Sequence, residues 1–266
     1  MNLEEYLALD ENEKPFDRMV TNGGFVGAFR TIGCVGDSLS SGEFQSLNDE
    51  GKTGYHDYFE YSWGQYMARE AGCKVYNFSR GGMTAKEYCE TFALQNDFWN
   101  PSLACQAYII ALGVNDLCNR HWEIGTTDDV NLEDWTKNAP TFMGYYCQII
   151  SRLREIQPKA RIFLMTIPRG TNEERNAICE AHAKALYEIA KLYEFTYVLD
   201  FYRDAPVFNQ DFRKRFFLSG HMNPMGYQLI ARMVMSSIDY IIRHNPDDFK
   251  QVGFIGTPYH NVGEKW

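Results

Sequence analysis

The chain has 266 residues, of which 45% are hydrophobic and 23% charged, and its formal net charge is −9. This composition is typical of a soluble globular protein that buries a core. Because the chain is acidic and has no basic stripe, we expect neither a nucleic-acid partner nor docking on an anionic membrane.

Cysteine usage and the amino-terminal segment bear on the compartment. The seven cysteines are scattered, odd in number and without metal-ligand spacing, which favours reduced thiols over a disulfide framework. No basic segment followed by an apolar run is present near the start, and the most apolar run, residues 107–114, is too short to span a bilayer. We expect a cytoplasmic protein that uses no metal and no cofactor.

Short apolar runs alternate with segments of helical periodicity along the chain. The apolar runs predict strands over 30–35, 74–78, 105–112, 160–166 and 196–200. The periodic segments predict helices over about 60–71, 84–94, 141–157, 172–193 and 224–243. A capping-box pattern from Thr171 to Glu174 marks the start of the fourth helix, and Asn223 followed by Pro224 marks the start of the fifth.

This alternation predicts an α/β fold with a parallel sheet covered by helices on both faces. We expect one domain over residues 1–266, with its core at about 30–242, an N-terminal extension and a C-terminal tail over 245–266. The tail is expected to pack across the domain or a neighbouring subunit, and the oligomeric state is left open. In such sheets the ligand site lies beyond the carboxyl ends of the strands.

Unusual polar residues follow several predicted strands at that edge. Gly36-Asp37-Ser38-Leu39-Ser40 puts a serine on a sharp turn, where a nucleophile is exposed and close to backbone N–H donors. Gly82 at a helix entrance and the Asn115 amide supply N–H groups to an anion, and His221 precedes the last helix. Each feature alone is explained as well by a tight turn or a structural histidine, whereas together they form a specific set.

In order and spacing this set resembles the SGNH hydrolase superfamily, also called the GDSL esterase/lipase family, over about residues 30–242. The resemblance implies a flavodoxin-like, three-layer α/β/α fold with a five-stranded parallel sheet. It also implies ester or thioester hydrolysis without a cofactor. Ser38 would be the nucleophile and His221 the base, while the N–H groups of Ser38 and Gly82 and the Asn115 amide would hold the oxyanion.

One position departs from the family pattern. The aspartate that usually stands three residues before the histidine is replaced by Leu218. A backbone carbonyl near 218–219 could orient His221 in a Ser–His dyad, which we prefer. Alternatively, Asp204 or Asp211 in the preceding loop takes that role, or the site is impaired.

Other residues near the predicted edge are candidates for substrate binding. The long segment 41–63 follows Ser38 and is rich in aromatics, among them Tyr55 and Tyr58. It could form a lid or wall of the substrate pocket, or a surface excursion packed for stability. Asp37, His121 and Arg169 could also contact a substrate. For His121 and Arg169, a packed loop and a surface ion pair are at least as good an interpretation.

The leading hypothesis is a serine hydrolase that cleaves a short-chain, acetyl-type ester of a carbohydrate or another small molecule. The alternatives are a lysophospholipase or acyl thioesterase, and a non-catalytic domain that binds a glycan or a partner. Leu218 is the feature that favours the last of these.

Overall fold

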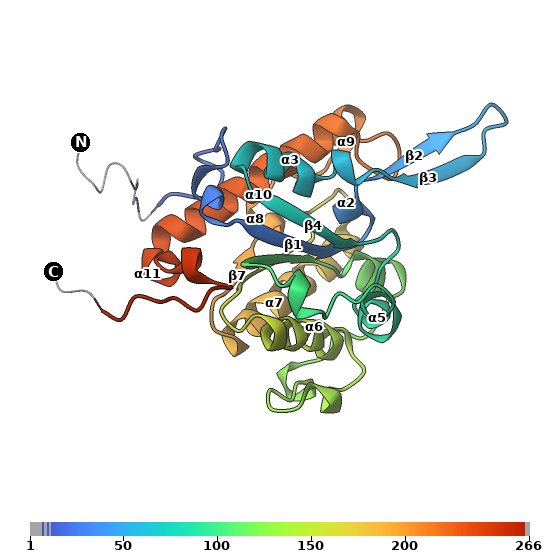
Figure 1. Ribbon diagram of the computed structural model, residues 1–266. Helices are drawn as coiled ribbons and strands as arrows, with labels where there is room; N and C mark the ends of the chain where they lie inside the picture. The colour runs from blue at the N-terminus through green and yellow to red at the C-terminus, as the bar shows by residue number, and fades with distance from the viewer. Residues whose placement is uncertain (1–6, 8–9, 11, 264–266) are drawn as a thin grey trace.

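A five-stranded parallel sheet in the order β4-β1-β5-β6-β7 forms the centre of the molecule (Figure 1). The computed structural model describes residues 7, 10 and 12–263. The strands are β1 (Thr31–Gly36), β4 (Lys74–Ser79), β5 (Ala107–Ala111), β6 (Arg161–Met165) and β7 (Thr196–Leu199). Each lies within two residues of the range that its apolar run predicts.

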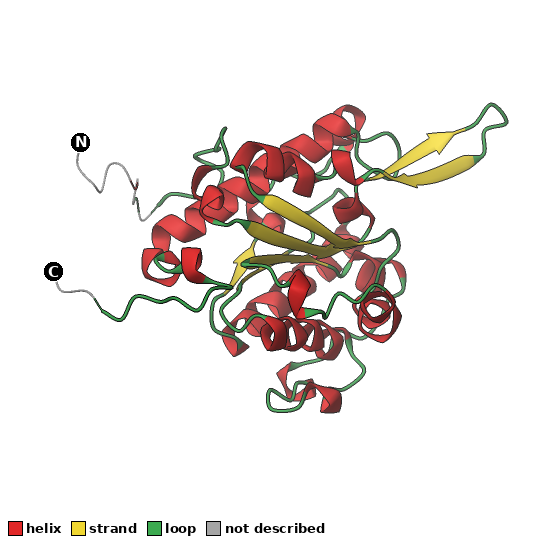
Figure 2. Ribbon diagram, in the orientation of Figure 1, coloured by secondary structure: helices red, strands yellow, loops and turns green. Residues whose placement is uncertain are grey.

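Helices cover both faces of the sheet, as Figure 2 shows. The longer helices are α3 (Trp63–Ala71), α6 (Phe142–Ile156), α7 (Glu173–Leu192) and α10 (Pro224–His244). Short helices are α2 (Ser38–Ser41), α4 (Ala85–Glu87), α5 (Ala93–Gln95), α8 (Phe201–Asp204), α9 (Gln210–Phe216) and α11 (Pro246–Phe249). The predicted α/β/α layers are therefore confirmed.

The sheet separates two hydrophobic cores, because successive side chains of a strand point to opposite faces of the sheet. Ile32 of β1 packs in one core with Trp63 of α3 and Val234 of α10. Val35, on the other face of β1, packs in the second core with Ile150 of α6. With both faces buried, the carboxyl edge of the sheet is where polar groups can gather.

Two helix predictions need correction, one in the interior of the helix and the other at its N-cap. The segment 84–94 begins at the Thr84 cap but widens into a π-helical turn over Tyr88–Phe92 between α4 and α5. Helix α7 is capped by Asn172, whose Oδ1 accepts from the Arg175 N–H at 2.8 Å, so the capping box expected at Thr171 is wrong by one residue. Asn223 caps α10 as predicted.

The segment after Ser38 contains a β-hairpin that the sequence pattern did not indicate. Strands β2 (Glu43–Leu47) and β3 (Thr53–Asp57) pair antiparallel, with Glu43 opposite Asp57. Figure 1 shows the hairpin projecting from the body of the molecule. Its residues are mostly exposed or half-buried, so it lacks the apolar alternation by which a half-buried strand is recognised.

The tail packs against the opposite edge of the sheet. Val252 and Ile255 are buried, and Gln106 Nε2, just before β5, donates to the Val252 carbonyl at 2.8 Å. Arg30 Nη1, just before β1, donates to the Gly253 carbonyl at 2.8 Å. The tail therefore covers the amino ends of the strands and leaves the carboxyl ends free.

Candidate active site

A tight turn positions Ser38 at the carboxyl end of β1. Asp37 is the N-cap of α2, and its Oδ1 accepts from the Leu39 N–H at 3.1 Å. A side chain at Gly36 would overlap Ser40 Oγ, so the end of β1 requires glycine. Ser38 is thereby presented as the first residue of a helical turn.

Gly82 and Asn115 come from the loops after β4 and β5, and the two loops are bonded to each other. Gly82 has φ +72°, a conformation that favours glycine, and the space where a Cβ would lie is open. Asn115 Nδ2 donates to the Met83 carbonyl at 3.1 Å, and Asn119 Nδ2 donates to Asn115 Oδ1 at 2.9 Å. One N–H of the Asn115 amide is thus used for orientation, and the amide has a second.

His221 lies in the turn between α9 and α10. The Leu218 N–H donates to the His221 carbonyl at 2.9 Å, and Phe217 and Met222 form an isolated antiparallel bridge around it. The His221 Nε2 atom lies 3.1 Å from Glu43 Oε1 of β2. Among the described residues, Nδ1 has no hydrogen-bond partner although it is buried.

Within the described residues, none of the groups that the sequence suggested for orienting His221 bonds to its ring. Nδ1 bonds to no backbone carbonyl. Asp204 instead pairs with Arg203 at 2.8 Å, Asp211 is exposed in the first turn of α9, and Leu218 is 56% exposed. Sequence reasoning missed Glu43, for which the only signal is a carboxylate five residues after Ser38.

The structure brings the predicted residues together in one cleft of about 640 Å³. Its lining includes, besides Glu43, the residues Asp37, Ser38, Gly82, Asn115 and His221. These come from the carboxyl ends of β1, β4 and β5 and from the loop before α10.

Three further candidates lie outside the lining of this cleft. Tyr55 is 59% exposed on β3, but its ring meets the His221 ring edge-on with centroids 5.8 Å apart. His121 lines a separate depression beside Trp122. Arg169 stacks over Tyr202 at 5.6 Å and donates to the Arg203 carbonyl. The positions of His121 and Arg169 offer no support for a role in substrate binding.

Burial sets the charge states in the cleft. It raises the pKa of Asp37 to about 7, and the negative charges of Asp116 and Glu43 add to the effect. It also raises the pKa of Glu43, with Asp57 contributing. Burial lowers the pKa of His221, although Asp57 acts in the opposite direction. A neutral imidazole, which a general base requires, is therefore favoured at neutral pH.

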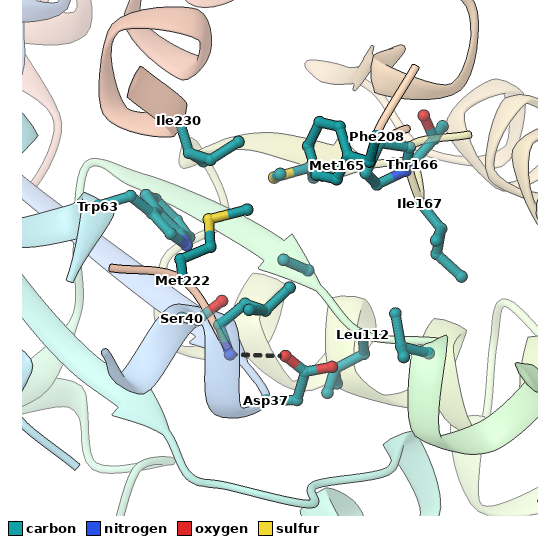
Figure 3. A pocket seen from close by; sticks show the side chains of 14 residues that line it. Asp37, Ser40, Trp63, Leu112, Met165, Thr166, Ile167, Phe208, Met222 and Ile230 are labelled. Carbon is teal, nitrogen blue, oxygen red and sulfur yellow. Dashed lines mark hydrogen bonds between the residues drawn. The ribbon is translucent and has the colours of Figure 1, made fainter. Parts of the chain in front are cut away.

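A second, small cavity of about 50 Å³ lies against Asp37 and Leu39, the two neighbours of Ser38 (Figure 3). Its walls are largely apolar and include Trp63, Met165 and Ile230. It has room for about three to five water-sized groups.

Two further findings concern metals and membranes. Over the part of the chain that is described, no three His, Cys, Asp or Glu side chains are grouped as a metal site. Within the same residues, no helix combines the length and the apolar character needed to cross a membrane.

Comparison with solved structures gives fold matches at low identity. A family two carbohydrate esterase from Clostridium thermocellum, in complex with cellohexaose, has a TM-score of 0.54 and 18% identity over 82% of this chain and 65% of its own. A carbohydrate esterase family 2 enzyme from Corynascus thermopiles has a TM-score of 0.53 and 14% identity over 79% and 65%. A protein from Lactobacillus plantarum has a TM-score of 0.57 and 16% identity over 79% and 97%.

Comparison with curated protein sequences finds no match. The model of the GDSL-like Lipase/Acylhydrolase family matches residues 34–229. That match covers most of the chain and includes the carboxyl end of β1 with Ser38, the loops that carry Gly82 and Asn115, and the turn of His221. The chain therefore belongs to the GDSL-like lipase/acylhydrolase family, and its sheet and helix layers are those of an SGNH hydrolase fold.

Proposed function

We propose that the protein is a serine esterase that removes a short acyl group, such as acetyl, from a carbohydrate or another small molecule. The observation that carries the proposal is the meeting of Ser38, Gly82, Asn115 and His221 in one cleft. A nucleophile, a base and oxyanion donors are the parts that acyl transfer needs.

The chemistry follows from these groups. His221 takes the proton of Ser38 as Oγ bonds to the acyl carbonyl carbon, and the carbonyl oxygen becomes an oxyanion. The N–H groups of Ser38 and Gly82 and the Asn115 amide hold that charge. His221 then gives the proton to the leaving alcohol as the C–O bond breaks. Water, deprotonated by His221, attacks the acyl-enzyme and releases the acid.

The acyl preference rests on the cavity against Asp37 and Leu39. Its volume of about 50 Å³ suits a methyl or short alkyl group, and its largely apolar walls suit the same group. The sugar component rests on the two carbohydrate esterases among the structural neighbours.

A fluorophosphonate probe tests the catalytic part. We expect the protein to be labelled at Ser38 and the Ser38→Ala variant to stay unlabelled, because the probe reacts only with an activated serine. An unlabelled wild-type protein, beside a labelled control esterase, would contradict the proposal and favour the non-catalytic alternative.

A chain-length series tests the acyl part. With p-nitrophenyl esters we expect kcat/KM to be highest from acetate to butyrate and to fall steeply beyond butyrate. A rise toward decanoate would instead favour the lysophospholipase or thioesterase alternative. Matched acetates of a sugar and of a simple alcohol, compared by KM, separate the sugar preference from the acyl preference.

A further inference from the structure

Glu43 is the carboxylate that contacts the histidine of the cleft. Its Oε1 lies 3.1 Å from His221 Nε2, and the two side chains are only 13% and 17% exposed. Ion pairs shielded from water are less screened by salt than exposed ones. No other ion pair joins His221 to a carboxylate of the described residues.

The surrounding structure holds both partners in place. The Tyr227 hydroxyl of α10 donates to the Glu43 carbonyl at 2.6 Å, which ties β2 to the helix that follows His221. On the histidine side, the Gly220 N–H donates to Gln45 Oε1 at 2.7 Å. One hydrogen bond therefore joins the hairpin to the His221 turn and another joins it to α10, and neither uses the side-chain contact between Glu43 and His221.

Glycine at position 81 makes room for the carboxylate. A Cβ at Gly81 would overlap Glu43 Oε2, and the three atoms nearest that point all belong to the Glu43 carboxyl group. The loop that carries Gly82 thus shapes the place that the carboxylate occupies.

The contact favours one tautomer of the ring. A carboxylate oxygen 3.1 Å from Nε2 favours a proton on that nitrogen, and a neutral imidazole then carries its lone pair on Nδ1. That atom is buried and has no described hydrogen-bond partner. It is the ring nitrogen left to take a proton, and a proton taken there produces an imidazolium next to a carboxylate.

We propose that Glu43 is the positioning residue of this active site, orienting His221 and stabilising its protonated form in place of the aspartate that Leu218 replaces. The proposal deepens the proposed function and rests on it. The carboxylate would then come from the hairpin that follows Ser38 in the chain, instead of from the turn that carries His221.

Other charged groups lie near the cleft, and of these Asp57 raises the pKa of His221. Asp57 lies opposite Glu43 in the hairpin, and Asp37 is beside Ser38 in the same cleft. Arg213 of α9 lines the cleft and donates to the Ser219 carbonyl at 3.1 Å. Among the charged groups of the described residues, only Glu43 forms an ion pair with the His221 ring.

The test compares Glu43→Ala, Glu43→Gln and Glu43→Asp with Glu50→Gln. Glu50 is on the same hairpin but exposed at its tip, so it serves as the matched control. Wild-type labelling by fluorophosphonate comes first, because it tests the proposed function separately. Thermal unfolding of each variant checks that it is folded.

We expect Glu43→Ala to lower kcat/KM for p-nitrophenyl acetate by about 10- to 100-fold, mainly through kcat. Glu43→Gln retains an acceptor without its charge, so its kcat/KM should lie between those of Glu43→Ala and the wild type. Glu43→Asp retains the charge on a shorter side chain and should recover part of the rate. Loss of the carboxylate should also lower the pKa of His221, measured by NMR with His221→Gln for assignment. The acid limb of the pH profile should then move to lower pH. Glu50→Gln should match wild type in each measurement.

Gly81→Ala provides a second route, since it displaces the carboxylate while Glu43 is retained. We expect it to lower kcat in the wild type but to add little in the Glu43→Ala background.

Equal rates and an unchanged His221 pKa in folded Glu43→Ala would overturn the proposal, with the esterase assignment intact if labelling persists. A rise in kcat/KM would overturn it too, because Glu43 would then compete with Ser38 for the ring. An unlabelled wild type would instead be a failure of the proposed function.

Discussion

Asn115 serves two purposes with one amide group. Its Nδ2 donates to the Met83 carbonyl and its Oδ1 accepts from Asn119, so the side chain is held from both ends. A preorganised donor stabilises a developing oxyanion without having to reorient during the reaction. In our proposal the second N–H of this amide is that donor.

Replacing Asn115 by alanine tests this role. We expect kcat for acetyl ester hydrolysis to fall by about 10²–10³-fold, with a much smaller change in KM, because the donor acts in the transition state. Asn119→Ala, which removes the bond to Asn115 Oδ1 but leaves the donor, should cause a smaller loss. Steady-state kinetics on both variants measures the difference, and an Asn115→Ala enzyme with unchanged kcat would remove Asn115 from the oxyanion hole.

At the scale of elements, the start of α10 determines where the histidine turn lies. Asn223 Oδ1 accepts from the Gly226 N–H at 2.9 Å, and its Nδ2 donates to the Arg215 carbonyl at 2.7 Å. The same residue therefore caps α10 and binds it to α9. His221 lies two residues upstream, so the cap is mechanically linked to the residue that we propose as the base.

We expect Asn223→Ala to lower the free energy of unfolding by about 1–2 kcal/mol, because an N-cap and a second hydrogen bond are lost. It should also lower kcat, since the turn that holds His221 loosens. Asn223→Ser keeps a capping oxygen and should recover most of the stability. Urea unfolding measures both variants, and a change in Asn223→Ala of less than about 0.5 kcal/mol would speak against the linkage.

The molecule as a whole carries buried titratable groups with opposing effects on stability. His182 of α7 is buried against the Leu112 carbonyl, and burial lowers its pKa to about 4. Since the unfolded chain binds that proton near pH 6.5, stability from this group is lost as the pH falls from about 6.5 to 4. Burial raises the pKa of Asp37 to about 7, so its contribution is lost in the other direction, as the pH rises from about 4 to 7.

We expect His182→Gln to remove the loss of stability that His182 causes as the pH falls. Between pH 7 and pH 5 the wild type should lose about 2 kcal/mol of unfolding free energy relative to this variant, whatever their difference at pH 7. His260→Gln, at an exposed tail position, is the control and should run parallel to wild type. Urea unfolding at the two pH values gives the result, and parallel curves for His182→Gln would contradict it.

The sequence by itself determined the order of strands and helices and the edge at which the site lies. Local patterns carry that information, because apolar runs, helical periodicity and caps such as Asn223 reflect interactions between near neighbours. The placement of Ser38, Gly82, Asn115 and His221 in one cleft follows from the parallel sheet, since the ends of its strands meet at one edge.

Only the tertiary structure decided which carboxylate meets His221. Glu43 and His221 are far apart in the chain, and their contact depends on a polar hairpin that has no apolar alternation to reveal it. His121 and Arg169 also follow strands in the sequence, but they lie outside the cleft. Their positions depend on the course of their loops, which tertiary packing sets. The edge of the sheet at which the site lies was therefore predictable from the sequence, and the contacts that loops make there were not.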